Sequence, residues 1–353
     1  MLSRLPRLDM SMIRPSRIAL SRFALATLVP AFLLAVAALA GGVWPLIAVL
    51  SMTALVVALD YLIIEEGPKE GVEFPAEPWL AQALAWVHFV LLALGVWALS
   101  GATGLGAGER LLLFVGLGLY FGQVSNSNAH ELIHAGSKRL RRLGMWVYIS
   151  MLYGHHASAH VRVHHVHVGT EADPASAEVG ESFYAYARRA WVDGFRAGYE
   201  AEQDLTARGT KRRLNPYVAY VGGAVGMLAL AGAIGGFGGV LALLGLAGYA
   251  QVQLLMSDYV QHYGLRRKTL HGTTLEPVGP QHSWNAPHWY SSALMMNAPR
   301  HSDHHVHPGK GYADLQLEDE TPMLPYSLPV MATLALWPAG WRKVMDWRVV
   351  YWT

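Results

Sequence analysis

Long runs of apolar residues dominate the pattern of this 353-residue chain. A membrane-spanning helix needs about 20 consecutive, mostly apolar residues, and six segments come close to or exceed that length. We therefore predict six transmembrane helices, paired along the chain as three hairpins, at residues 23–41, 42–64, 79–99, 111–134, 216–234 and 237–262. Gly235 and Gly236 separate the last two runs, and Asp60 lies near the end of the second.

The polar segments fall into a long loop and a tail. Residues 135–215 are predicted to form a loop with helices of its own, and residues 263–353 a tail. A short run at Met331–Trp337, bracketed by prolines, predicts an interfacial or re-entrant helix. The fold class expected is an all-α integral membrane protein, with residues 1–353 forming one domain.

Lysine and arginine are distributed very unevenly about the six runs. All of the 27 except Arg110 fall on the side that holds both termini. Basic loops stay in the cytoplasm, so both termini, the loop and the tail are predicted to be cytoplasmic. Arg4, Arg7, Arg14, Arg17 and Arg22 precede a first run too long for a signal-peptide core, which predicts an uncleaved first helix.

Composition narrows the chemistry. Apolar residues make up 53% and charged residues 15%, against about 25% charged in soluble domains. The absence of cysteine excludes disulfide scaffolds, cysteine-held metal sites and thiol catalysis. A net charge of +2 gives no sign of nucleic-acid binding, whereas 17 histidines indicate metal or proton chemistry.

The histidines cluster in boxes. His130 and His134 are four residues apart, which puts both on one face of a helix. In the second box the later histidines stand four and five residues after the first. The third box is one isolated histidine. In the fourth box the later histidines stand three and four residues after the first. The members of these later boxes are His160, His164, His165, His262, His301, His304 and His305.

These nine histidines exceed the four ligands of a tetrahedral zinc. They suit two metal ions of higher coordination number, and imidazole suits iron, copper, nickel and zinc. The first box alone matches the His-Glu-x-x-His of zinc peptidases, with Glu131 as base, but Ser137 and Leu140 break the longer metzincin pattern. A metal transporter would need more ionisable residues in the bilayer than His88 and Asp60.

Several neighbouring residues have expected supporting roles. Glu131, Asp258 and Asp303 stand beside candidate ligands and could accept the outer ring N–H. His88 is expected to be a packed or hydrogen-bonded histidine. Supporting or surface roles are expected for His155, His156, His167 and His307. Interfacial anchoring is expected for Trp284, His288 and Trp289.

At these boxes the chain resembles the membrane-bound alkane 1-monooxygenases, which are non-haem di-iron hydroxylases related to xylene monooxygenase and more distantly to membrane fatty-acid desaturases. The resemblance runs from about His130 to Asp346. Besides the boxes it rests on the strings Tyr153-Gly154-His155, Asp173-Pro174-Ala175-Ser176-Ala177, Gly180-Glu181-Ser182, Asp258-Tyr259-Val260-Gln261-His262-Tyr263-Gly264-Leu265, Ser283-Trp284-Asn285 and Arg300-His301-Ser302-Asp303-His304-His305.

The resemblance implies hydroxylation of an unactivated C–H bond with O2, at two non-haem iron ions held by all nine histidines. It also implies electrons from rubredoxin and rubredoxin reductase, a terminal methyl of an alkane or similar substrate, and a bacterial inner membrane. With no cysteine, no rubredoxin is fused to this chain. A desaturase or another oxidase of acyl chains remains an alternative. The departures from the family pattern are Ala159, Val163, Asp258, Gln261 and Ala298-Pro299.

Overall fold

The computed structural model describes residues 15–63, 78–209, 214–272, 274–318 and 320–353, with the side chains of 15–21 and 78 left out. The basic residues Arg4, Arg7, Arg14 and Lys69, and those at 211–213, lie outside the described residues. The chain is almost wholly helical there, as expected, with one two-stranded hairpin.

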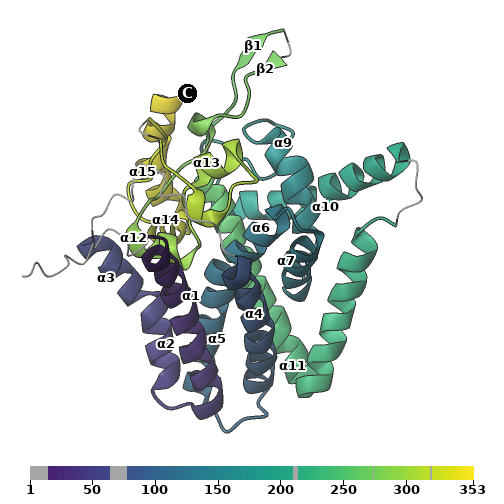
Figure 1. Cartoon of the computed structure of the whole chain (residues 1–353), viewed down its shortest axis with the longest axis vertical. Coiled ribbons are helices and arrows are strands. Elements are labelled where there is room, and N and C mark those ends of the chain that lie inside the picture. The colour runs from purple at the N-terminus through teal and green to yellow at the C-terminus, as the bar shows by residue number, and fades with distance from the viewer. Residues whose placement is uncertain (1–14, 64–77, 210–213, 273, 319) are drawn as a thin grey trace, which may run out of the picture.

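The membrane-type part consists of long apolar helices. Helices α1, α2, α4, α5 and α11 pack on one another in the lower half of the molecule (Figure 1). The bounds in this part are α1 Pro15–Ala40, α2 Trp44–Met52, α3 Ala54–Leu62, α4 Pro78–Leu99, α5 Ala107–Tyr120, the π-helix η2 Phe121–Ser125, α6 Asn126–His134 and α11 Tyr217–Gln261.

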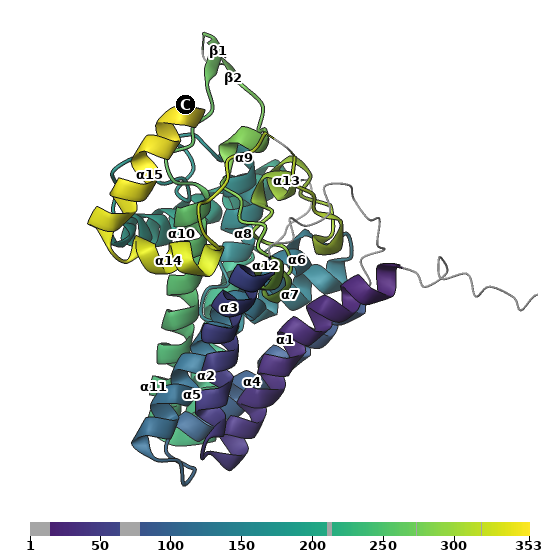
Figure 2. The same ribbon diagram turned by 90° about the vertical axis from the view of Figure 1, so that its left-hand side faces the viewer.

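The remaining elements form a head at one end of the bundle (Figure 2). Their bounds are α7 Lys138–Ser150, α8 His156–Ala159, the π-helix η3 His160–His164, α9 His165–His167, α10 Phe183–Arg208, β1 Thr269–His271, β2 Thr274–Leu275, the 3-10 helix η4 Pro280–His282, α12 Trp289–Leu294, α13 His301–Val306, the 3-10 helix η5 Tyr312–Asp314, α14 Leu328–Ala335 and α15 Pro338–Trp352. Strands β1 and β2 pair antiparallel and project from the head.

In the described chain, four helices are long and apolar enough to cross a membrane: Arg22–Ala40, Trp44–Leu62, Trp79–Leu99 and Tyr217–Gln261. The fourth run expected from the sequence is helical over Ala107–His134, but η2 divides it. The fifth and sixth runs fall within α11, which bends into a V where Gly235 and Gly236 leave helical geometry (Figure 1). Gly236 has a φ of 59°, which favours glycine.

Small residues let α5 and η2 approach α11 closely. A Cβ on Gly118 would lie 1.8 Å from the ring of Tyr249, and one on Gly122 would lie 2.1 Å from the Gln253 amide. The Gln253 side chain donates to the Gly118 carbonyl at 2.7 Å. This glycine pair at i and i+4 acts as the small-residue contact typical of helices packed in lipid.

Two polar side chains within the apolar helices have structural partners. His88 on α4 is fully buried, with Nδ1 2.9 Å from Ser125 Oγ and Nε2 2.8 Å from Ser150 Oγ, so it joins α4 to η2 and α7. This confirms the packed, hydrogen-bonded role expected of it. Asp60 on α3 accepts the backbone N–H groups of Tyr290 and Ser291 at 2.9 Å each, which fastens the bundle to α12 in the head.

Candidate metal centre

The nine candidate histidines meet in two adjoining groups at the junction of bundle and head. In each group the ring nitrogens that face inward all lie within 4.8 Å of one another. The first group contains His130, His134, His160, His165 and His304, and the second contains His164, His262, His301 and His305. No carboxylate belongs to either group among the described residues.

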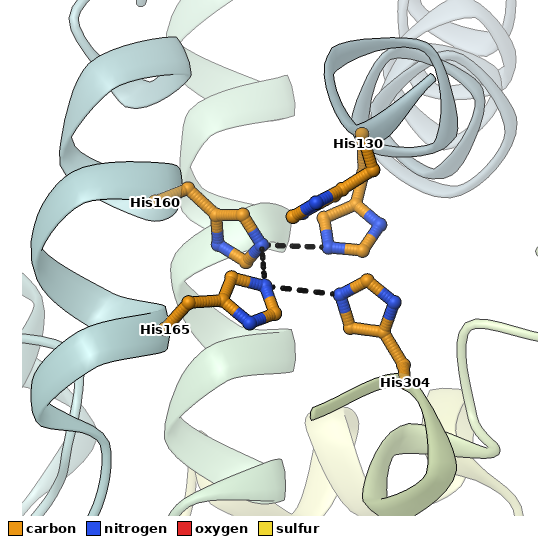
Figure 3. Close-up of side chains that lie close together, drawn as sticks. His130, His160, His165 and His304 are labelled. Carbon is orange, nitrogen blue, oxygen red and sulfur yellow. Dashed lines mark hydrogen bonds between the residues drawn. The ribbon is translucent and has the colours of Figure 1, made fainter. Parts of the chain in front are cut away.

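In the first group the Nε2 atoms form a connected series (Figure 3). His130 Nε2 lies 2.8 Å from His160 Nε2, which lies 3.0 Å from His165 Nε2. His165 Nε2 in turn lies 3.1 Å from His304 Nε2. These rings come from α6, η3, α9 and α13, so three separate parts of the sequence build one site.

The second group repeats this arrangement. His262 Nε2 lies 2.8 Å from His301 Nε2, and His301 Nε2 lies 3.1 Å from His305 Nε2. His164 Nε2 completes the series at 3.1 Å from His305 Nε2. The two groups adjoin, because the rings of His165 and His305 stack with centroids 4.6 Å apart.

Helix geometry decides which group each ring joins. On the α-helix α6, His130 and His134 share a group at i and i+4, as the sequence predicts. In the second box the partners are instead His160 and His165, at i and i+5, while His164 joins the other group. A π-helix has more residues per turn, so i+5 returns to the same face. The fourth box is also split, since His304 joins the first group.

Hydrogen bonds alone do not account for this packing of imidazoles. Each neutral Nε2 offers either one N–H or one lone pair, so it can make one such hydrogen bond. His160 Nε2 and His165 Nε2 each have two close nitrogen neighbours, so these contacts cannot all be hydrogen bonds. Among the described residues, buried His134 Nε2 has no hydrogen-bond partner at all. Two nitrogens at right angles about 2.1 Å from one ion lie about 3 Å apart, which matches the observed spacings. The residues therefore fit a metal ion in each group.

The protonation of the rings suits metal binding. Burial, followed by the charges of neighbouring histidines, lowers the pKa values of His160, His165, His304 and His305. These rings are therefore neutral at pH 7, the form in which imidazole binds a metal.

Asp173 holds His164 in place from outside the group. Its Oδ2 lies 2.9 Å from His164 Nδ1, and the Ser176 hydroxyl donates to the same oxygen at 2.7 Å. Burial opposes charge on both groups, but their mutual attraction and hydrogen bond outweigh it, so the pKa of Asp173 is lowered and that of His164 raised. Asp173 fixes Nδ1 as the protonated nitrogen and leaves Nε2 facing inward.

The sequence did not single out Asp173 for this role; it singled out Glu131, Asp258 and Asp303. Asp303 binds His307 Nδ1, Lys310 and the Gln316 backbone, at 2.6–2.8 Å, and so shapes the chain after α13. The Glu131 carboxylate accepts from the Tyr312 backbone. Asp258 lies within electrostatic range of His164 and Asp173 and lines the cavity described below.

The other histidines near the boxes stay outside both groups. His155 packs its ring against Tyr153, Trp191 and Phe195. His156 stacks on Tyr153 with centroids 5.4 Å apart. The prediction of interfacial anchoring is wrong for Trp284, which is 1% exposed and donates from Nε1 to the Tyr263 carbonyl at 2.9 Å. Hydropathy does not distinguish a core tryptophan from an interfacial one.

A cavity of about 1320 Å³ reaches the centre from the apolar bundle. His130, His160 and His301 line it at the metal end, together with Asp258. Most of the remaining lining comes from α3, α11 and α14. The volume exceeds the 300–1,000 Å³ typical of small-molecule sites. A long apolar molecule therefore fits between the helices with one end at the histidines.

Comparison with known proteins places this geometry in context. The fatty acid desaturase family matches residues 109–335. Alkane 1-monooxygenase 2 of Pseudomonas aeruginosa is 30% identical over 321 residues, covering 87% of this chain and 84% of that protein. Alkane 1-monooxygenase of Pseudomonas putida is 31% identical over 296 residues, covering 81% and 72%. Alkane 1-monooxygenase 1 of Alcanivorax borkumensis is 31% identical over 273 residues, covering 75% and 66%.

Proposed function

This chain belongs to the alkane 1-monooxygenase family of enzymes, and from that premise we propose that it hydroxylates a terminal methyl group of an alkane or similar hydrophobic substrate. The observation that carries the proposal is the convergence of nine imidazoles in two groups beside an apolar cavity. A mostly helical chain with several apolar helices supplies the membrane setting in which such substrates dissolve.

We propose two iron ions, one in each group of histidines. The inward Nε2 spacings of 2.8–3.1 Å and the purely nitrogen donor set support this assignment. The first group would hold its ion with up to five rings, and the second with four. When bound, the iron ions supply the redox chemistry that activates O2, which amino-acid side chains lack.

The residues of the chain position the substrate and keep water away. The balanced reaction adds one oxygen atom of O2 to R–H to give R–OH, and reduces the other to water with two electrons and two protons. His130, His160 and His301 present their rings to the cavity, so a methyl group at that end lies against both groups. The apolar walls of α3 and α14 hold the rest of the chain and exclude water from the reacting end.

We propose rubredoxin, reduced by rubredoxin reductase, as the electron donor. The resemblance of the histidine boxes to those of the family supports this donor.

We propose six spans, with both termini cytoplasmic in a bacterial inner membrane. The helical segment Ala107–His134 would be the fourth span, and the bend at Gly235 and Gly236 would divide α11 into the fifth and sixth. The distribution of lysine and arginine supports this topology. A reporter fused after Thr353 should be active in the cytoplasm; activity in the periplasm would contradict the six-span topology.

The deciding experiment for the function combines metal analysis with ¹⁸O2. Purified protein given reduced rubredoxin and an n-alkane should yield the primary alcohol with one ¹⁸O atom, and should contain about two irons per chain. Unlabelled product, or no iron, would overturn the proposal.

The match to the fatty acid desaturase family keeps one second candidate, an oxidase of acyl chains. It predicts an alkene without ¹⁸O from a fatty acyl substrate, so the same experiment separates the two. The His-Glu-x-x-His zinc peptidase is disfavoured, since His130 and His134 meet three further histidines in one group.

A further inference from the structure

The large cavity has a rim of apolar residues that are exposed on the outside of the molecule. Tyr61, at the end of α3, is 81% exposed, and Trp337, just after α14, is 65% exposed; both line the cavity. The other exposed lining residues are smaller; they include Ala54, Val57, Ala58, Val252, Thr333 and Leu336. The rim therefore faces hydrocarbon rather than water in a chain that spans a membrane.

The regular spacing of α3 directs one of its faces into the cavity. Ala54, Val57, Ala58 and Tyr61 recur at the three- and four-residue spacing of one helical face, and all four line the space. Asp60, next to Tyr61, is tied to α12 by two hydrogen bonds. That tie holds the end of α3, and Tyr61 with it, at the level where bundle and head meet.

Helix α14 forms another wall of the cavity. Its Met331 and Ala335 are fully buried in the head, while Val330, Thr333 and Leu334 line the cavity. The Tyr184 hydroxyl donates to the Leu336 carbonyl at 2.9 Å, which fixes the end of α14 against α10. Trp337 then follows at the turn into α15, with its side chain at the rim.

We propose that Tyr61 and Trp337 flank a doorway through which substrate enters sideways from the bilayer, and that their rings restrict entry to narrow, unbranched hydrocarbon chains. Tyrosine and tryptophan favour the membrane interface, which is the depth at which this rim lies beside the head. An alkane dissolved among lipid tails reaches such an opening without crossing water. The two rings are the bulkiest side chains on the rim, so they set its width. This inference rests on the proposed function.

The first test removes the rings one at a time. Tyr61→Ala and Trp337→Ala should lower the KM for a bulky cyclic alkane by about tenfold relative to an n-alkane, with little change in kcat for the n-alkane. Leu62→Ala is the matched control, because Leu62 adjoins Tyr61, is 73% exposed and does not line the cavity. An unchanged preference in both ring variants would overturn the doorway.

The second test closes the doorway without turnover. Since the chain has no cysteine, Trp337→Cys and Leu62→Cys each create a single labelling site. A bulky maleimide on Trp337→Cys should slow uptake of a deuterated n-alkane into iron-loaded protein without an electron donor about tenfold compared with the unlabelled variant. A small methanethiosulfonate label should slow it far less, and neither label should matter on Leu62→Cys. Equal uptake with both labels at position 337 would overturn the inference.

These readouts separate the two proposals. If the iron-loaded wild-type protein oxidises no hydrocarbon, the proposed function is wrong, and the uptake rates still decide whether the doorway exists. If it oxidises n-alkanes and the position-337 labels change nothing, the doorway alone is wrong.

Discussion

His160 Nε2 and His165 Nε2 lie 3.0 Å apart, although the two residues are five positions apart in the chain. His164, the expected i+4 partner of His160, faces the other group and approaches His305. The π-helix η3 therefore sends adjacent histidines to two different sites, while the two rings that share a site are five residues apart.

Removing one ring should reduce metal binding at its own group first. His304→Ala should lower the iron content well below two per chain and abolish alcohol formation. The reason is that the first group loses one of its five imidazoles, the ring at the end of its series of Nε2 contacts. Metal analysis and product assay check this. His307→Ala is the control, since His307 is exposed and outside both groups. Full iron content in His304→Ala would contradict its place in the site.

Asp173→Asn should weaken iron binding without unfolding the protein. An amide keeps the shape of the carboxylate but loses the charge that orients His164 Nδ1, and changes of this kind cost about 10–100-fold in metal affinity. A competition titration against a chelator measures the loss. Asp193→Asn removes an exposed carboxylate instead and should leave the affinity unchanged. Equal affinities in both variants would rule out this role of Asp173.

Substitution of Asp60 measures how much its hydrogen bonds between bundle and head stabilise the fold. Asp60→Ala removes the acceptor of two backbone N–H groups and should cost about 0.5–2 kcal/mol of unfolding free energy, as at a lost helix cap. Asp60→Asn keeps an acceptor oxygen and should recover most of it. Thermal unfolding in detergent gives both values, and identical melting of the two variants would refute the capping role.

His88→Leu should destabilise the bundle by about 1–3 kcal/mol, since the buried Ser125 hydroxyl loses its imidazole partner and the tie between α4 and α7 disappears. Iron content should stay unchanged, because His88 belongs to neither group. His271→Leu, at an exposed position in β1, is the matched control for histidine loss. A loss of iron in His88→Leu would show a role in the metal site instead.

Chelation of the metal should lower the melting temperature. A ligand that binds only the folded state at 100 times its Kd stabilises that state by about 2.7 kcal/mol, and its removal forfeits this amount. Nine rings gathered in two groups, six of them buried, lose the ions between them on chelation. Melting curves before and after chelation and iron re-addition measure the effect; superimposable curves would contradict metal binding at this site.

The sequence predicted the helical membrane fold and the nine histidines, since apolar length and clustering are visible in one dimension. It predicted the pairing of His130 with His134 because that box lies on an α-helix. The division of the second box between two metal sites could not be foreseen, because nothing in its amino-acid sequence predicts a π-helix. The contact of Asp173 with His164 was not predicted, because a turn and not helix spacing brings the two together.

The count of transmembrane helices shows a different limit. Hydropathy separates two runs at Gly235 and Gly236, and the backbone of α11 leaves helical geometry at these same two residues. Conversely, one apolar run, 111–134, is divided by η2. Backbone geometry and apolar length are separate properties, and the sequence pattern reports only the second.

The splitting of the boxes makes the two metal sites interdependent. Neighbouring His164 and His165, and likewise His304 and His305, are assigned to opposite groups. Any shift of η3 or α13 that distorts one site therefore distorts the other, and an ion captured by one site preorganises its neighbour. Iron should accordingly be acquired cooperatively, so that fully loaded and empty molecules outnumber those carrying a single ion.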